Sequence, residues 1–367
     1  MQFFTGYIEG YYGKLLAWHD RDRLLDGLEA VGMTSYFYAP KDDAFHRQFW
    51  RQTYDAAWRR AFKRFTGKAV TKDIQIVAGI SPGLDFDFAS LDQANSAGGD
   101  FTILLDKALM LLADGANVIA LLMDDVAADF DLRAGSFTSE GTAHAVLTNR
   151  LGAALNAPII LVPRIYADSL IKSDDPQSKT YLKDLARDLE PHHKVVYCGD
   201  DIVAVQPGND RDGCLHPSKV IIWDNFYAND YCPTRLFLGD ITGRDFFRGN
   251  PYGHVINGTG LINTDEFLIS KVFDKKKKIN LPSELLPLFD SPFKNINKSE
   301  INKIIKNFKD IKKAVFETTD DNLFLEWKPY LVQALNDIEL IKNFKSKQTI
   351  ETYLHRRYSP LVSQTFN

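Results

Sequence analysis

The chain has 367 residues, enough for one large domain and a small one, or for two domains of middling size. Hydrophobic residues make up 45% and charged residues 25%, which excludes a chain that is disordered throughout, a collagen or a coiled coil. The formal net charge of -4 argues against a dedicated binder of nucleic acid or of an anionic membrane. The charge is uneven, however, because residues 1–270 carry 26 basic and 36 acidic side chains, whereas residues 271–367 carry 18 basic and 12 acidic ones.

Several sequence signals are absent. Cys198, Cys214 and Cys232 form no CxxC pair, so we expect neither a disulfide framework nor a zinc site built on cysteines. No apolar run reaches the roughly 18 residues of a membrane helix, and the N-terminus lacks a signal peptide, which favours a cytoplasmic location unless a leader was removed. No phosphate-loop, dinucleotide or HExxH motif occurs, so we expect no cofactor and no metal.

The first 260 residues alternate between short apolar runs and longer amphipathic stretches. We expect helices at Asp22–Val31, Ile103–Ala113 and Thr180–Leu189. We expect strands at Phe3–Ile8, Ser35–Tyr38, Ile74–Ile80, Val118–Met123, Ile159–Val162, Lys194–Tyr197, Val220–Trp223 and His254–Ile256. Eight strands that alternate with helices over this length predict an α/β fold, a (β/α)8 TIM barrel. The rival is an open doubly wound sheet, although its usual glycine-rich first turn is missing.

After about residue 280 the pattern is purely helical. Ser299–Thr318 and Asn322–Lys345 carry apolar residues at helical spacing, and a short helix at Gln348–Arg357 follows. We therefore predict a barrel domain over residues 1–270 and a small α-helical C-terminal domain over residues 280–367.

Polar clusters follow most of the predicted strands. In a barrel the carboxyl ends of all strands face one bowl, which is where barrel enzymes have their active sites. The clusters are Glu9-Gly10, Pro40–Asp43, Ser81–Gly83, Asp124-Asp125, Tyr166, Asp224-Asn225 and Asn257. We expect them to converge in space.

The strongest of these local features is Asp124-Asp125. Two adjacent carboxylates cannot both ionise freely, so one is held protonated to higher pH and the pair supplies an acid and a base. Taken alone, the dipeptide is more often a solvated turn or a helix N-cap. Trp223 beside Asn225 suits a sugar ring, or is a buried ring before a polar turn. Lys41 could contact a hydroxyl, although pairing with the neighbouring aspartates is the commoner role.

Five segments in this order closely resemble the catalytic domain of glycoside hydrolase family 84. This family contains the O-GlcNAcases and related bacterial β-N-acetylglucosaminidases, some of them described as hyaluronidases. The resemblance covers about residues 3–265. The segments are Gly6–Gly13, Tyr38–Asp43 with His46-Arg47 and Trp50-Arg51, Ile80–Asp85, Ala120–Asp125, and Trp223–Asn225 with Ala228–Tyr231.

The resemblance implies a (β/α)8 barrel and a retaining hydrolase in which the substrate's own acetamido oxygen attacks the anomeric carbon. Asp124 would orient the acetamido N–H and stabilise the oxazoline intermediate. Asp125 would be the general acid and then the base.

The resemblance also implies substrate-binding roles for seven residues. They are Gly10 and Lys41 at the 3-hydroxyl, Tyr166 and Asn225 at the acetamido group, Trp223 along its pocket, and Asp230 and Asn257 at the 4- and 6-hydroxyls. The chain departs from the family at Arg164-Ile165, at Gly258-Thr259, and at Cys198, where a small residue could reshape the acetamido pocket.

We expect the substrate to be O-GlcNAc on Ser or Thr of proteins, removed by exo action because Asp230 suits a free 4-hydroxyl. Two alternatives stay open: the same chemistry on hexosamine oligosaccharides such as hyaluronan fragments, and a non-catalytic sugar-binding protein. The expected partner is therefore a glycosylated protein or an N-acetylglucosaminide, with no nucleic acid and no membrane. The helical tail could support a homodimer.

Overall fold

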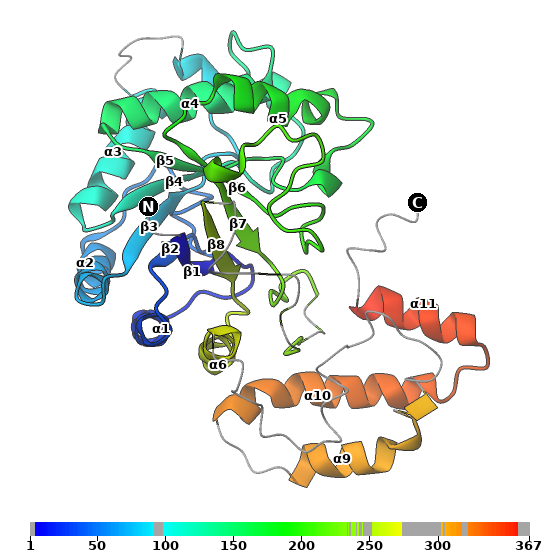
Figure 1. Cartoon of the computed structure of the whole chain (residues 1–367). Helices are drawn as coiled ribbons and strands as arrows, with labels where there is room; N and C mark the ends of the chain where they lie inside the picture. Colours follow the sequence, from blue (N-terminus) through cyan, green and yellow to red (C-terminus); the bar gives the residue numbers. More distant parts are fainter. Residues whose placement is uncertain are drawn as a thin grey trace. The chain divides into compact units, whose positions relative to one another are not determined.

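The computed structural model describes residues 4–91, 98–232, 234, 236–239, 241, 244, 252–273, 302–303, 305–317 and 322–358. Its eight parallel strands close into a barrel in sequence order, with β1 paired to both β2 and β8 (Figure 1). The strands are β1 (Phe4–Glu9), β2 (Ser35–Tyr38), β3 (Gln75–Ile80), β4 (Val118–Leu122), β5 (Ile159–Val162), β6 (Lys194–Tyr197), β7 (Val220–Asp224) and β8 (Gly253–Asn257). The predicted TIM barrel is confirmed, and the open sheet is excluded.

Every strand is buried along nearly its whole length, which is why the runs are apolar on both faces. One set of side chains fills the barrel interior and the other faces the surrounding helices. The interior cluster includes Phe4, Ile8, Phe37, Val77, Ala120, Leu122, Ile160, Val162, Val196, Ile221, Trp223 and Val255. The barrel is a packed core rather than a pore, so a ligand site must lie at its end.

Helices follow the first five strands. They are α1 (Trp18–Ala30), α2 (Ala56–Val70), α3 (Asp100–Ala113), α4 (Glu140–Leu155) and α5 (Pro176–Asp188). Side chains of Asp55, Ser139 and Asp175 cap the first turns of α2, α4 and α5. Residues 198–219, which join β6 to β7, contain a short 3₁₀ turn at Pro217–Lys219 and no α-helix. The alternation of strand and helix is therefore incomplete on this side.

The contacts divide the chain into two compact units. One is Met1–Phe226 with Gly243–Gly260, and the other is Tyr227–Thr242 with Leu261–Asn367. The second unit contains α6 (Ile262–Phe273), α9 (Phe308–Glu317), α10 (Asn322–Ile341) and α11 (Lys347–Tyr358). The division places α6 with the tail helices, whereas the sequence suggested a boundary near residue 270.

Within the second unit, Glu326 of α10 accepts hydrogen bonds from the backbone N–H groups of Asn263 and Thr264, at 3.0 and 2.8 Å. The Trp327 indole N–H donates to Thr264 Oγ1 over 3.0 Å. The start of α6 is thereby joined to α10. The predicted helix at Ser299–Thr318 lies partly outside the described residues. Among the helices of the described ranges, none is long and apolar enough to cross a bilayer.

Candidate active site

Asp124 and Asp125 lie at the carboxyl end of β4. The Asp124 side chain is buried, and Asp125 has a left-handed backbone with φ of 54°. Lys41, from the loop after β2, forms an ion pair with Asp124, and its Nζ lies 3.6 Å from Asp125 Oδ2. Adjacent strand residues normally point to opposite faces, but here the chain turns as it leaves the sheet. Both carboxylates therefore share one ammonium group.

Two tyrosines hold the Asp125 carboxylate. The Tyr166 hydroxyl donates to Oδ1 at 2.7 Å, and the Tyr12 hydroxyl donates to Oδ2 at 2.9 Å. Arg47 fixes the backbone of the pair, since its guanidinium donates to the carbonyl oxygens of Asp124 and Asp125 at 3.2 and 2.7 Å. Sequence reasoning assigned no role to Tyr12 or Arg47, although both lie in segments that carry the family resemblance.

The two carboxylates differ in their electrostatic surroundings. Burial raises the pKa of the Asp124 carboxyl, against the opposing effect of the Lys41 ammonium. Burial also acts to raise the pKa of Asp125, but Lys41 and the two tyrosine hydroxyls outweigh it, so this pKa lies below its usual range. The pKa values of the two neighbouring carboxyls are therefore shifted in opposite directions, which separates the members of an acid–base pair.

One oxygen of the pair has no partner. Asp124 Oδ2 is held by Lys41, whereas the buried Oδ1 has no hydrogen-bond partner among the described residues. Leaving a buried acceptor unsatisfied costs about 1–3 kcal/mol, more for a charged group. Such an oxygen at a strand end is an unused acceptor for the N–H of a bound molecule.

Four further predicted residues form a connected network. Asn257 Oδ1 accepts a hydrogen bond from the Gly10 backbone N–H at 3.2 Å, and its Nδ2 donates to Asn225 Oδ1 at 2.9 Å. The Trp223 indole N–H donates to the same Asn225 oxygen, also at 2.9 Å. A Cβ atom on Gly10 would lie 2.2 Å from the Trp223 ring, so this position accepts only glycine.

Cys198 lies beside this network and close enough to the carboxylates to be affected by their charge. Its Sγ accepts a weak contact from Asn225 Nδ2 at 3.6 Å. Burial, followed by the charges of Asp224, Asp125 and Asp124, raises the pKa of the Cys198 thiol well above its usual value. The thiol is therefore a small, neutral group beside Asn225.

Lys107 of α3 organises the loop that presents Lys41 and Arg47. Its buried ammonium donates to the backbone carbonyls of Phe45, Trp50 and Gln52, at 2.5, 2.9 and 2.7 Å. Burial lowers the pKa of Lys107 to about 8, so at pH 7 it keeps all three donors.

The departure at Arg164 has a structural explanation. Arg164 Nε donates to both oxygens of Glu140 at 2.7 Å, and Nη1 donates to Asp175 at 2.8 Å. Glu140 begins α4 and Asp175 caps α5, so this buried network joins the end of β5 to the starts of two helices.

The departure at Gly258 is also constrained, since a Cβ there would lie 2.2 Å from the Tyr7 hydroxyl oxygen. Thr259 follows it, and its carbonyl accepts a hydrogen bond from Lys14 Nζ at 3.1 Å. The ninth predicted site residue, Asp230, belongs to the second unit, where its carboxylate accepts the Tyr231 N–H at 3.0 Å. Its role at the sugar stays a prediction.

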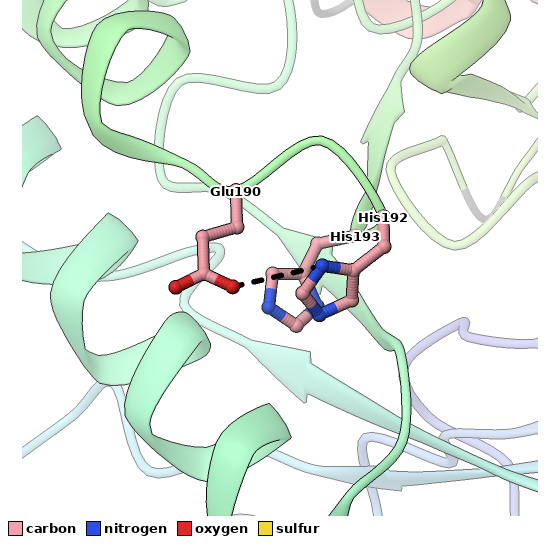
Figure 2. Close-up of side chains that lie close together, drawn as sticks. All are labelled: Glu190, His192 and His193. Carbon is pink, nitrogen blue, oxygen red and sulfur yellow. Dashed lines mark ion pairs between the residues drawn. The ribbon is translucent and has the colours of Figure 1, made fainter.

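A cluster elsewhere has residues that could ligate a metal. Glu190, His192 and His193 lie together in the turn between α5 and β6 (Figure 2). The His193 Nδ1 accepts the Ile159 backbone N–H at 3.0 Å, which puts the ring proton on the buried, unpartnered Nε2. Neither nitrogen of His193 then offers a free lone pair, so this arrangement does not fit a metal centre.

Known proteins resemble this chain in sequence and in fold. The sequence model of the β-N-acetylglucosaminidase family matches residues 5–248. The protein O-GlcNAcases of Mus musculus and Rattus norvegicus are each 31% identical over 255 residues, 66% of this chain and 26% of theirs. The chain therefore spans about a quarter of the length of these relatives.

Two solved structures share the fold. CpGH84B has a TM-score of 0.69 and 22% identity, with 95% of this chain and 71% of that chain covered. A mutant of the Thermobaculum terrenum O-GlcNAc hydrolase has a TM-score of 0.71 and 20% identity, with 92% and 83% covered. The match to the family model confirms the resemblance that the motifs indicated: the chain belongs to the β-N-acetylglucosaminidase family, glycoside hydrolase family 84.

Proposed function

We propose that the chain is a retaining exo-β-N-acetylglucosaminidase that uses the substrate's acetamido group as nucleophile and removes O-linked N-acetylglucosamine from Ser and Thr. The observation that carries this proposal is the buried, unpartnered Oδ1 of Asp124 next to a second carboxylate. An acetamido N–H that donates to this oxygen would satisfy it. It would also turn the acetamido carbonyl oxygen towards the anomeric carbon.

The placement of the carboxylates supports assistance by the substrate. A retaining enzyme with its own nucleophile needs two carboxyl groups about 5–5.5 Å apart on the two sides of the scissile bond. Asp124 and Asp125 are neighbours that share the Lys41 ammonium, so both approach a sugar from one side.

Other buried carboxylates near these strand ends are already engaged. Arg21 and Tyr36 hold Glu9, Tyr38 and Tyr54 hold Asp43, and Arg244 and His254 hold Asp224. None of these three described carboxylates is thus available as the nucleophile, which supports the acetamido oxygen in that role.

In the proposed reaction Asp124 accepts the acetamido N–H, and its charge stabilises the positive oxazoline intermediate. Asp125 protonates the leaving oxygen as its bond to the anomeric carbon breaks. The Asp125 carboxylate then removes a proton from the water that attacks from the leaving-group side. Lys41 stabilises the negative charge on whichever carboxylate is ionised.

The relative acidities of the two carboxyls must change before the first step. Without substrate, burial raises the pKa of Asp124 while Lys41 and the two tyrosine hydroxyls lower that of Asp125, and these are the opposite directions to those that the reaction needs. A bound sugar would replace a tyrosine hydroxyl on Asp125 with its leaving oxygen and would exclude water, and both changes raise the Asp125 pKa. At the same time the acetamido N–H would favour an ionised Asp124.

The remaining predicted residues have matching proposed roles. Asn225 and Tyr166 would contact the acetamido group, and Trp223 would line its pocket. Gly10 and Lys41 would bind near the 3-hydroxyl. Asn257 would bind at the 4- and 6-hydroxyls of a terminal sugar.

The decisive experiment compares Asp125→Asn with wild type on a glycopeptide and on an activated aryl N-acetylglucosaminide. Loss of the general acid should remove most of the activity on the glycopeptide. The loss of activity on the aryl glycoside should be smaller, because its leaving group needs little protonation. Asp73→Asn is a matched control, because Asp73 is also a non-glycine residue with φ of 54° but lies in the turn before β3.

Three outcomes would contradict the proposal. If Asp125→Asn hydrolyses both substrates as well as wild type does, the assignment of Asp125 as the general acid is wrong. Saturable binding without turnover would indicate a sugar-binding protein. Preference for hexosamine oligosaccharides such as hyaluronan fragments would give the other substrate.

A further inference from the structure

The backbone of the Asp124-Asp125 pair is bound by a second cation, which comes from the same loop as Lys41. Arg47 is 4% exposed, and its guanidinium donates to the Asp124 carbonyl oxygen over 3.2 Å and to the Asp125 carbonyl oxygen over 2.7 Å. Lys41 binds the same dipeptide at its carboxylates. One loop thus supplies a cation for the side chains of the pair and another for its backbone.

The backbone of Asp125 needs support of this kind. Its φ of 54° is left-handed, a conformation that few residues other than glycine adopt. Aspartate tolerates it best when its carboxylate bonds to its own local backbone. Here the hydroxyls of Tyr166 and Tyr12 donate to the two carboxylate oxygens instead. Hydrogen bonds from a charged guanidinium are stronger than neutral ones, so the two from Arg47 can stabilise the left-handed form.

The guanidinium of Arg47 is itself held in place. Its Nη1 also donates to the Ser81 hydroxyl at 3.0 Å, and the Ser81 backbone N–H donates to the His46 carbonyl at 2.9 Å. Ser81 is fully buried and directly follows β3. A Cβ on Gly83 in the same loop would lie 3.0 Å from Met123 Cα, so this loop packs closely on the backbone just before the pair. The loops after β2, β3 and β4 are therefore joined around Arg47.

We propose that Arg47 is a positioning residue, which holds Asp125 in the left-handed conformation from which its carboxyl group reaches the leaving oxygen. The inference rests on the proposed function, in which Asp125 is the general acid. Such an acid must come within about 2.6–3.2 Å of the oxygen that it protonates. Relaxation of the Asp125 backbone to a right-handed conformation would turn its side chain in another direction. A displacement of about 1 Å can already cost about 100-fold in rate.

The effect of Arg47 should depend on the leaving group. The alkoxide of Ser or Thr is a poor leaving group and needs a proton as its bond breaks, whereas a dinitrophenolate needs little protonation. A misplaced acid therefore slows the first class of substrate far more than the second. Asp124, whose carboxylate is held separately by Lys41, assists the acetamido group with both classes. The dependence on the leaving group thus separates a misplaced acid from general damage to the site.

The test measures kcat/KM for aryl N-acetylglucosaminides that range from the dinitrophenyl to the unsubstituted phenyl glycoside. In Arg47→Met, as in Asp125→Asn, the phenyl glycoside should lose about tenfold more activity than the dinitrophenyl glycoside, or more than that. Arg47→Lys keeps the buried charge but not the planar fork, so its selective loss should be about threefold or more. This second variant decides the question if Arg47→Met does not fold.

Arg51→Met is the matched control. Arg51 is a partly exposed arginine of the same loop, and it pairs with Asp85 and Asp100 rather than with the carboxylates of the site. The variant should keep the wild-type dependence on the leaving group, because these ion pairs lie outside the contacts of Arg47 with the pair.

Three results would overturn the inference. The first is a wild-type dependence on the leaving group in both Arg47 variants. The second is an equal loss for every glycoside, which would show general damage. The third is the same selective loss in Arg51→Met, which would show displacement of the whole loop. If Asp125→Asn itself keeps the wild-type dependence, or wild type hydrolyses no N-acetylglucosaminide, the proposed function fails and this inference fails with it.

Discussion

Replacing Lys107 with methionine would test whether one buried ammonium supports the loop that presents Lys41 and Arg47. Methionine has a similar length but no donor. The carbonyl oxygens of Phe45, Trp50 and Gln52 would each lose a hydrogen bond. Neither Lys107 nor these three carbonyl groups belongs to the proposed reacting groups.

The size of the effect follows from those three acceptors. A buried carbonyl without a donor costs about 1–3 kcal/mol, and two of the three bonds are only partly buried, so we take the lower value for each. The free energy of unfolding should therefore fall by about 3 kcal/mol. In a unit of this size each kcal/mol lowers Tm by about 2–4 °C, which gives about 6–12 °C in total.

Thermal unfolding followed by circular dichroism gives the first readout, and kcat/KM on an aryl N-acetylglucosaminide well below Tm gives the second. Displacement of the loop should lower kcat/KM by up to about 100-fold. Lys179→Met is the control, because the exposed Lys179 donates to a single carbonyl, that of Ser173. If Lys107→Met lowers Tm no more than the control does, the reasoning about the three carbonyls is refuted.

Two further predictions concern the carboxylates. Tyr12→Phe removes a hydrogen-bond donor that favours ionised Asp125, so the Asp125 pKa should rise. Because the general acid must be protonated, the alkaline limb of the pH profile of kcat/KM should move to higher pH. An alkaline limb at the same pH as in wild type would contradict this prediction. Arg164→Met leaves the buried Glu140 and Asp175 without their cation and should cost about 3–5 kcal/mol in urea unfolding, whereas a loss under 1 kcal/mol would show that the network contributes little.

The barrel could be predicted because each of its strands is a separate apolar run. β2, β5 and β6 have the predicted bounds, and β1, β3, β4, β7 and β8 differ by one residue at one or both ends. These strands are buried on both faces, so their sequence signal does not depend on the neighbouring segments. The assignment of α6 was harder, because its own sequence does not show that it contacts α10.

The site was less accessible to sequence reasoning. The adjacent aspartates stand out because both carboxylates are in one dipeptide. Tyr12 does not, because its hydroxyl meets Asp125 across 113 positions of the chain. The role of Lys107 could not be predicted for a different reason. A lysine in an amphipathic helix is normally exposed, whereas Lys107 is 2% exposed.

The left-handed backbone of Asp125 limits which inactive variants can be interpreted. Alanine or a branched residue at φ of 54° would add strain of about 1–3 kcal/mol to the loss of the carboxylate. Asparagine adopts this conformation readily, so Asp125→Asn changes chemistry and little else. Inhibitor-trapping studies of this protein should thus use the asparagine variant, since any loss of binding in an alanine variant would mix backbone rearrangement with the missing charge.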